Sequence, residues 1–259
     1  MPRLGLGTYR SGPGYEAQQS ALWALEAGYR LIDTALAYGN EPDVGAAVRR
    51  SGVPREEIFL TTKLENDDHG YEQTLAACSQ SLKNLQIDYL DLYLIHWPVP
   101  GLRHQTWKAM EQLYSEGKCR AIGVSNYTIR HLQELLAESK TVPAINQVEF
   151  HPFLYQRELQ EYCSDHGIRV ESYSPLMKAT RFDHPLLVKL AAKYGKTPAQ
   201  ILLRWHMEHG LIAIPKSVHR EWIQENIDIW KFALAFEDVE SLDGLNERRH
   251  LDWDPTDIP

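Results

Sequence analysis

Cysteine is scarce in this chain and forms no recognisable motif. The three cysteines, Cys78, Cys119 and Cys163, stand far apart, without a CxxC or Cys/His pairing. Such a set supports neither a disulfide framework nor a zinc site, so we expect reduced, partly buried thiols and no metal. The HExxH motif of zinc proteases and the P-loop of nucleotide hydrolases are also missing, so neither signature is available to define an activity.

Long apolar runs and an excess of basic residues are absent as well. No apolar run approaches the roughly 18 residues that span a bilayer, and the opening segment MPRLGLGTYR has no apolar signal core. We therefore expect a cytoplasmic protein with no membrane partner. The formal net charge of −8 disfavours nucleic acid as a partner, because nucleic acid binds a basic face. An anionic ligand must then be held by a local basic cluster.

What the chain does have is an alternation of strand-like and helix-like segments. Runs such as LDLYLI are almost continuously apolar, which is typical of strands covered on both faces. Strands are predicted near 4–8, 30–33, 58–62, 89–95, 119–124, 144–148, 168–173 and 211–215. Eight strand–helix units with short links predict an α/β fold, a (β/α)₈ TIM barrel, as a single domain over residues 1–259.

Helices are predicted where apolar residues recur every three or four positions. The segment 70–84 and the residue after it show this spacing at Leu75, Cys78, Leu82 and Leu85. Further helices are predicted near 16–28, 41–50, 105–116, 128–138, 156–166 and 198–209. Residues 219–259 exceed the basic barrel: helices to about 246, followed by the polar tail HLDWDPTDIP. This tail is either loosely held, as termini often are, or it folds Trp253 toward the barrel mouth as part of a lid.

Four chemically active side chains stand at or just past the ends of three successive predicted strands. Asp33 and Tyr38 lie in LIDTALAYGNE, Lys63 in IFLTTKL and His96 in DLYLIHWP. In a (β/α)₈ barrel these strand ends face one common mouth, so we expect the four side chains to converge. A phenol, a lysine, a carboxylate and an imidazole can together deliver a proton to a carbonyl group. They cannot supply a hydride, so the reaction requires a cofactor.

Tyr38 is the predicted general acid of this group. A free tyrosine has a pKa of about 10, and an ammonium about 4 Å away stabilises the phenolate by up to roughly 4 kcal/mol at an effective dielectric near 20. Lys63 would thereby lower the phenol pKa by about three units at most. Asp33 is expected to pair with Lys63, and His96 to hydrogen-bond the substrate oxygen. Singly, each residue has a structural alternative: an interfacial aromatic, a solvated lysine, a helix cap or a packed histidine. Their joint position favours catalysis.

Eight short motifs resemble, in order along the chain, the signatures of the aldo-keto reductase family. They are GLGTY (5–9), LIDTALAYGNE (31–41), TTKL (61–64), LYLIHWP (92–98), AIGVSN (121–126), NQVEFHP (146–152), SYSPL (172–176) and IPKS (214–217). Within the family the chain is most similar to compact microbial reductases of the 2,5-diketogluconate reductase type. The resemblance implies a (β/α)₈ barrel that binds extended NADPH without a Rossmann fold. It also implies that Tyr38 is the proton donor and that the protein is a monomer.

The same resemblance implies a nicotinamide across the mouth. Ser125, Asn126 and Gln147 resemble the residues that hydrogen-bond its carboxamide, and Tyr173 looks like the aromatic that stacks on its ring. Their structural alternatives are satisfaction of loop backbone for the polar residues and core packing for Tyr173. The full set of implied cofactor residues is Thr8, Asp33, Ser125, Asn126, Gln147, Tyr173, Ser174, Leu176, Lys216, Ser217, Val218, Trp222, Glu225 and Asn226.

The segment after the last predicted strand bears on the choice between NADPH and NADH. Lys216, Ser217 and Val218 resemble the family's 2′-phosphate clamp, and an ammonium, a hydroxyl and an N–H near a helix N-terminus suit a phosphate. Glu225 and Asn226 match positions that reach the adenine end.

Trp222 stands where the family usually has an arginine that grips the 2′-phosphate. An indole makes no charge-assisted bond, and losing one costs roughly 1.5–3 kcal/mol of NADPH preference. Unless Arg220 or His219 compensates, we expect NADPH to bind with a weaker preference over NADH than is usual in the family, so that NADH is also accepted.

The predicted reaction is the NAD(P)H-dependent reduction of small aldehydes or ketones, including dicarbonyl or sugar-derived ones, to alcohols. The expected substrate-binding residues are Tyr9, Tyr38, Glu65, His96 and Trp97. Glu65 stands where relatives often have a tryptophan. If Glu65 faces the mouth it disfavours carboxylate substrates, and if it faces solvent it has no bearing. The alternative function is a non-catalytic nucleotide-binding accessory or structural protein that kept the barrel.

Overall fold

Eight parallel strands form one sheet in the computed structural model, which describes residues 1–259. Each strand pairs with the next one in the chain. The strands are β1 (Leu6–Gly7), β2 (Leu31–Asp33), β3 (Phe59–Leu64), β4 (Leu92–Ile95), β5 (Ile122–Ser125), β6 (Ile145–Glu149), β7 (Arg169–Tyr173) and β8 (Ile212–Ala213). Backbone bonds from Gly5 N to Ala213 O (2.9 Å) and from Gly7 N to Pro215 O (3.1 Å) join the first strand region to the last. The sheet closes on itself, which confirms the predicted (β/α)₈ barrel.

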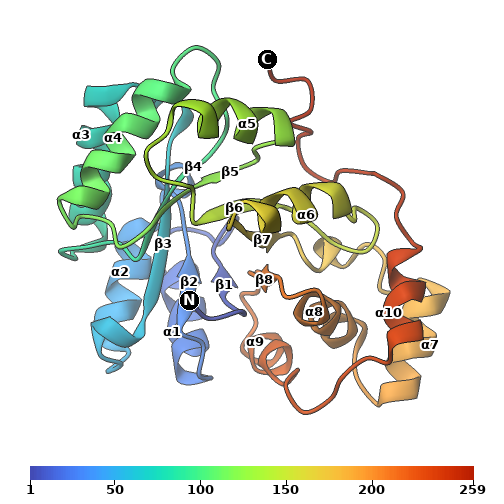
Figure 1. Ribbon diagram of the computed structural model, residues 1–259. Coiled ribbons are helices and arrows are strands. Elements are labelled where there is room, and N and C mark those ends of the chain that lie inside the picture. Colours follow the sequence, from blue (N-terminus) through green and yellow to red (C-terminus); the bar gives the residue numbers. More distant parts are fainter.

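Helices cover the outside of the sheet (Figure 1). They are α1 (Tyr15–Glu26), α2 (Glu41–Arg50), α3 (Tyr71–Leu85), α4 (Arg103–Ser115), α5 (Ile129–Glu138), α6 (Arg157–Asp165), α7 (Pro185–Tyr194), α8 (Pro198–Glu208), α9 (Arg220–Ile227) and α10 (Phe236–Asp243). Each helix predicted by apolar spacing is present close to its predicted bounds. Helix α7 was not predicted from the sequence. The helical region that was predicted to end near residue 246 consists of two helices, α9 and α10.

The alternation of side chains along each strand separates two apolar regions. Outward-facing residues pack with the helices in one large core, and a smaller cluster fills the inside of the barrel. The inner cluster is Leu31, Leu92, Leu94, Ile145, Ile212 and Ile214. Because both faces of every strand are covered, the strands read as almost continuously apolar. Inward-facing residues near the strand ends lie above this cluster and open onto the mouth.

Gly7 allows the barrel to close tightly at the level of the mouth. A Cβ atom at this position would lie 2.8 Å from the carbonyl oxygen of Ile214, so a larger residue would push β1 away from the chain after β8.

No helix has both the length and the apolar character needed to cross a bilayer. All three cysteines are buried free thiols.

Candidate active site

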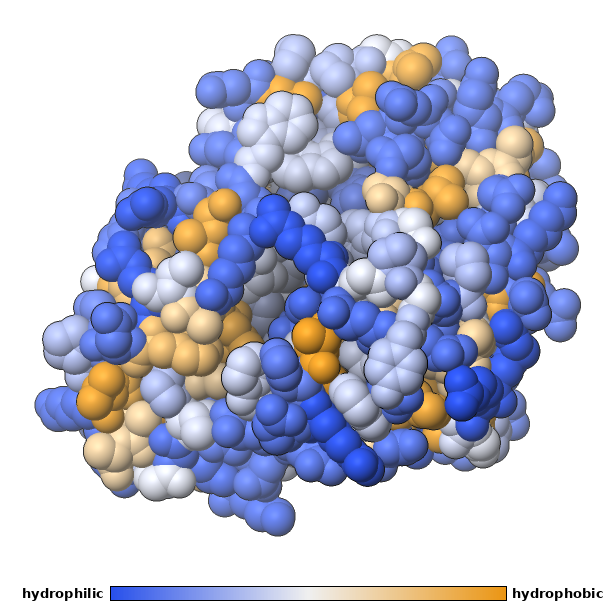
Figure 2. Space-filling view, turned by 180° about the vertical axis from the view of Figure 1, so that it is seen from behind, coloured by the Kyte–Doolittle hydropathy of each residue, from blue (hydrophilic) through white to orange (hydrophobic).

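A cavity of about 900 Å³ lies at the C-terminal ends of the strands. Figure 2 shows the molecule from behind the view of Figure 1, on a face whose surface is hollowed near its centre. The predicted site residues that line the cavity are Tyr9, Asp33, Tyr38, Glu65, His96, Trp97, Ser125, Asn126, Gln147, Tyr173, Ser174, Leu176, Lys216, Ser217, Trp222, Glu225 and Asn226. Thr8, Lys63 and Val218 do not line it. Thr8 is buried and donates its hydroxyl to the Asp33 carbonyl, and Lys63 is buried beside Asp33.

The structure brings together the four side chains that were predicted to converge. Asp33 ends β2, Tyr38 ends the 3-10 turn Leu36–Tyr38, Lys63 lies in β3, and His96 follows β4 directly. The Lys63 ammonium nitrogen lies 2.5 Å from a carboxylate oxygen of Asp33, 2.9 Å from the carbonyl of Thr34 and 3.4 Å from the Tyr38 hydroxyl. The rings of Tyr38 and His96 meet edge to face, with their centroids 5.7 Å apart.

The surroundings fix the charge of Lys63 and of His96. Burial alone would lower the pKa of Lys63, but the adjacent Asp33 carboxylate and Tyr38 outweigh burial and raise it, so the side chain is an ammonium. Burial and the positive charge of Lys63 lower the pKa of His96 to about 3. His96 is therefore a neutral imidazole at neutral pH, which has one N–H to donate.

The expectation that Lys63 brings the Tyr38 pKa below that of a free phenol is wrong. Burial raises the pKa of Tyr38 to about 12, and the opposing effect of Lys63 is smaller. The phenolate loses its hydration inside the mouth, and one ammonium does not replace it fully. Tyr38 thus holds its proton throughout the neutral range.

Polar residues in or directly after β5, β6 and β7 form one hydrogen-bonded network. The Asn126 amide donates to Ser125 Oγ (3.1 Å) and to the His96 carbonyl (3.0 Å). The Tyr173 hydroxyl donates to Asn126 Oδ1 (2.9 Å), and Ser125 Oγ donates to the Gln147 carbonyl (2.8 Å). These contacts hold the side chains of Ser125, Asn126 and Tyr173 in fixed positions around the cavity wall.

The backbone is strained at several points around the cavity. Non-glycine residues that line it with positive φ are Arg10 (58°), Asn126 (63°), Ser174 (49°), Lys178 (53°) and Ala179 (60°). Such conformations cost energy and are retained mainly where function requires them. Their concentration here supports a functional mouth.

The predicted phosphate end of the cavity carries an available cation. Lys216 is exposed, lines the cavity and takes part in no ion pair. Arg220, considered above as a substitute for the missing arginine, pairs instead with Glu26 of α1 at 3.4 Å. His219 packs against Trp222, with ring centroids 4.1 Å apart.

Aromatic residues form another part of the cavity wall. Tyr9 packs on Tyr38 with ring centroids 5.0 Å apart, and Trp97 packs on Trp253 at the same separation. Glu65 lines the cavity while its carboxylate accepts the Asn66 backbone N–H at 2.8 Å. Glu65 therefore borders the cavity, as the first of the two alternatives considered for it requires.

The C-terminal tail is anchored on Glu149, at the end of β6. The buried carboxylate accepts the backbone N–H groups of Leu251 (2.8 Å) and Asp252 (3.1 Å). His151 lies 3.0 Å and His250 3.6 Å from its oxygens. Burial would raise the pKa of Glu149, but these hydrogen bonds outweigh it and hold the pKa well below its usual range.

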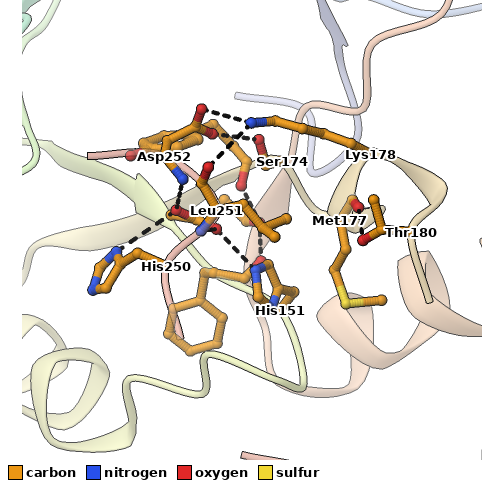
Figure 3. Close-up of polar contacts among 12 residues, drawn as sticks. His151, Ser174, Met177, Lys178, Thr180, His250, Leu251 and Asp252 are labelled. Atoms are coloured by element: carbon orange, nitrogen blue, oxygen red, sulfur yellow. Dashed lines mark hydrogen bonds and ion pairs between the residues drawn. The ribbon is translucent and has the colours of Figure 1, made fainter. Parts of the chain in front are cut away.

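The anchored tail reaches both sides of the mouth. The Asp252 carboxylate pairs with Lys178 (2.7 Å) and accepts from Ser174 Oγ (3.2 Å), both in the loop after β7 (Figure 3). The next residue, Trp253, packs on Trp97. Of the two alternatives for the tail, the structure shows the folded one, in which Trp253 forms part of the rim.

Sequence reasoning missed several residues that line the cavity. Among them are Arg10, Asn66, Lys178, Phe182 and Asp252. A basic residue shortly after SYSPL was an available signal for Lys178. Phe182 and Asp252 gave none, because they reach the cavity only through the path of the loop and of the tail.

A barrel whose mouth holds a buried lysine–carboxylate pair, a protonated phenol and a neutral imidazole belongs to the oxidoreductases that reduce carbonyl groups. Residues 3–247 match the aldo/keto reductase family, and the chain belongs to that family.

Individual relatives agree with this assignment. The chain is 48% identical to glyoxal reductase of Bacillus subtilis, over 100% of this chain and 94% of that protein. An aldo-keto reductase from a Medee basin deep-sea metagenome has a TM-score of 0.97 and 45% identity, covering 100% of this chain and 96% of its own. The Bombyx mori aldo-keto reductase in complex with NADP has a TM-score of 0.90 and 39% identity, covering 96% and 91%. The chain is therefore a reductase that uses a nicotinamide cofactor.

Glu149→Gln should loosen the tail, because the two backbone N–H groups would lose a charged acceptor. Hydrogen bonds to charged groups contribute about 1.5–3 kcal/mol, so amide exchange at Leu251 and Asp252 should accelerate by about tenfold or more in mass-spectrometric measurements. Glu240→Gln, at an exposed position of α10, is the matched control and should leave the tail unchanged. Unaltered exchange in Glu149→Gln would mean that the carboxylate does not hold the tail.

Proposed function

We propose that this protein reduces small, uncharged aldehydes and ketones, dicarbonyls among them, to alcohols, with NADPH as the preferred cofactor and Tyr38 as the proton donor. The observation that carries the proposal is the Tyr38 hydroxyl, which lies 3.4 Å from the Lys63 ammonium in the mouth of the barrel. The relative from Bacillus subtilis is named a glyoxal reductase, which supports a small dicarbonyl substrate. A cytoplasmic location and a monomeric state remain part of this proposal.

The residues around the cavity fit a nicotinamide dinucleotide. The Gln147 amide oxygen accepts no hydrogen bond from the protein, so Gln147, Ser125 and Asn126 would hold the carboxamide. Tyr173 would support the ring. Lys216 and Ser217 would hold the 2′-phosphate, since an ammonium and a hydroxyl suit an anion. The remaining contacts would come from other residues that line the cavity: Asp33, Ser174, Leu176, Trp222, Glu225 and Asn226. When bound, the cofactor supplies the hydride.

Tyr38 acts on the carbonyl oxygen of the substrate. As negative charge develops on that oxygen, it becomes a far stronger base than a phenolate, so a phenol with a pKa of about 12 still donates its proton. The Lys63 ammonium stabilises the phenolate that remains, and Asp33 keeps Lys63 charged and in place. The neutral imidazole of His96 donates a hydrogen bond to the same oxygen and holds it near Tyr38.

The rim of the cavity favours small uncharged substrates. Glu65 places a carboxylate in the wall, and Tyr9, Trp97 and Trp253 add aromatic surface. A carboxylate on the substrate would lie close to the negative charge of Glu65, and the repulsion between the two would weaken substrate binding. No observation favours the alternative of a non-catalytic accessory protein.

Tyr38→Phe should lower kcat for reduction of an activated aromatic aldehyde by about 10²–10⁴-fold, because it removes the general acid. NADPH consumption measures the rate, and quenching of tryptophan fluorescence should show cofactor affinity within about twofold of wild type. Tyr114→Phe, on the exposed face of α4, is the control. Turnover that persists in Tyr38→Phe would exclude Tyr38 as the donor. An inactive wild type that still binds NADPH would favour the accessory-protein alternative.

Lys216→Met should weaken NADPH binding by about tenfold or more and leave NADH binding nearly unchanged, because only NADPH carries the phosphate that the ammonium contacts. Trp222→Arg should shift the preference toward NADPH by a similar factor. Dissociation constants for both cofactors, from fluorescence quenching, give the comparison, with Lys189→Met on α7 as the control. Equal losses for NADPH and NADH in Lys216→Met would show that this lysine does not read the phosphate.

Glu65→Gln should raise kcat/KM for carbonyl substrates that carry a carboxylate by several-fold, since it removes a like charge from the wall, and should change kcat/KM for methylglyoxal little. The effect on the anionic substrate should shrink as salt is added. Asp67→Asn, at the exposed middle of the turn Asn66–Asp68, is the matched control. Identical substrate preference in Glu65→Gln and wild type would remove Glu65 from the substrate site.

A further inference from the structure

Glu171 is a fully buried acid inside the barrel that has no place in the reaction described above. Its neighbours on β7 face outward: Val170 packs in the outer core, and Ser172 contacts His206 of α8. Because side chains alternate along a strand, Glu171 points inward. It lies in register with Gln147 on β6 and Ile212 on β8. Inner barrel positions are usually filled by bulky apolar residues, as they are at Ile212, so a carboxyl here calls for a physical reason.

Glu171 is joined to the mouth through a single amide nitrogen. Gln147 Nε2 donates to Glu171 at 2.8 Å and to the second oxygen of Asp33, also at 2.8 Å. An amide nitrogen has two hydrogens, so both are used by these two acids. The amide oxygen of Gln147 is then the only polar atom of this side chain left for a ligand in the cavity. Glu171 therefore fixes which way the Gln147 amide points.

The charges around Glu171 favour its protonated form. Lys63 already pairs with Asp33, and the other cationic side chain near Glu171, Arg169, is exposed at the start of β7. One oxygen of Glu171 has no hydrogen-bond partner although it is buried. A buried carboxylate so poorly satisfied is costly. Burial, followed by the negative charge of Asp33, raises the pKa of Glu171 to about 8, against smaller opposing effects of Gln147, Lys63 and Arg169.

We propose that Glu171 is a positioning residue for carbonyl reduction, which carries a proton at neutral pH and holds Gln147 with its amide oxygen toward the cavity. This inference rests on the proposed function. The proposal predicts a pH dependence of the reaction, because the charge of Glu171 changes with pH. Below about pH 8 Glu171 is neutral, and above it a second negative charge lies across Gln147 from Asp33. That charge opposes formation of the phenolate on Tyr38, so reduction slows as the pH rises through this range.

Two substitutions of Glu171 distinguish the role of its proton from the role of its hydrogen bond with Gln147. Glu171→Gln is neutral at every pH and still accepts from Gln147, whereas Glu171→Leu removes the acceptor and fills the space with an apolar side chain. Ser172→Ala, on the outward face of the same strand, is the control. Infrared spectra of the free protein report the carbonyl stretch of a protonated carboxyl group and require neither cofactor nor turnover. NADPH affinity is measured by fluorescence quenching, and kcat by NADPH consumption from pH 6 to 9.5.

Wild type should show the band of a protonated carboxyl at pH 6.5 that disappears near pH 8, and Glu171→Gln should lack it. Glu171→Leu should bind NADPH about tenfold more weakly, whereas Glu171→Gln should bind within about twofold of wild type. The fall of wild-type kcat near pH 8 should be absent in Glu171→Gln.

Three results would each overturn the proposal: a band unchanged by Glu171→Gln, normal NADPH affinity in Glu171→Leu, or an unchanged pH profile in Glu171→Gln. If Glu171→Leu does not fold, the spectra and pH profile of Glu171→Gln still decide. A wild type that reduces no carbonyl would refute the proposed function, while the spectra would still report on Glu171.

Discussion

The buried ion pair between Lys63 and Asp33 is the contact on which the mouth of the barrel depends. Both side chains are almost fully inaccessible, and removing one would leave the other charge buried without a partner, at a cost of roughly 3–5 kcal/mol. The pair forms because β2 and β3 are neighbours, with Asp33 opposite Thr61, two residues before Lys63. From this pair, contacts run to Tyr38 on one side and to Gln147 on the other. The positions of the acid and of the amide are thus set by the same two charges.

The sequence was sufficient to predict the barrel and most of the mouth. Nearly continuous apolar strands alternating with amphipathic helices define the (β/α)₈ fold, and the fold brings the ends of β2, β3 and β4 to one place. Asp33, Lys63 and His96 could therefore be placed together from their positions at strand ends. The family motifs extended this prediction to Ser125, Asn126, Gln147 and Tyr173, which the structure joins in one network around the cavity.

Two features could not be predicted from local sequence patterns: the direction of the Tyr38 pKa shift and the path of the C-terminal tail. The sign of the shift in the Tyr38 pKa follows from burial and from Lys63 together, and the extent of burial is known only once the mouth is assembled. The path of the tail depends on contacts with residues far away in the sequence: Leu251 binds Glu149, about a hundred residues earlier, and Asp252 pairs with Lys178. Glu171 gave a weaker signal: it lies two residues before Tyr173, at the same inward parity, where an acid is unexpected.

The charges of the side chains in the mouth favour donation of a proton by Tyr38. The Lys63 and Asp33 charges cancel, His96 is neutral, and Glu171 carries its proton, so the group has no net charge while Tyr38 is a phenol. Donation creates one negative charge on Tyr38, and the ammonium 3.4 Å away is the only cation of the group positioned to stabilise it. In a poorly hydrated mouth such interactions are stronger than in water. A second buried negative charge would compete for the same ammonium, and the proton on Glu171 prevents this at neutral pH.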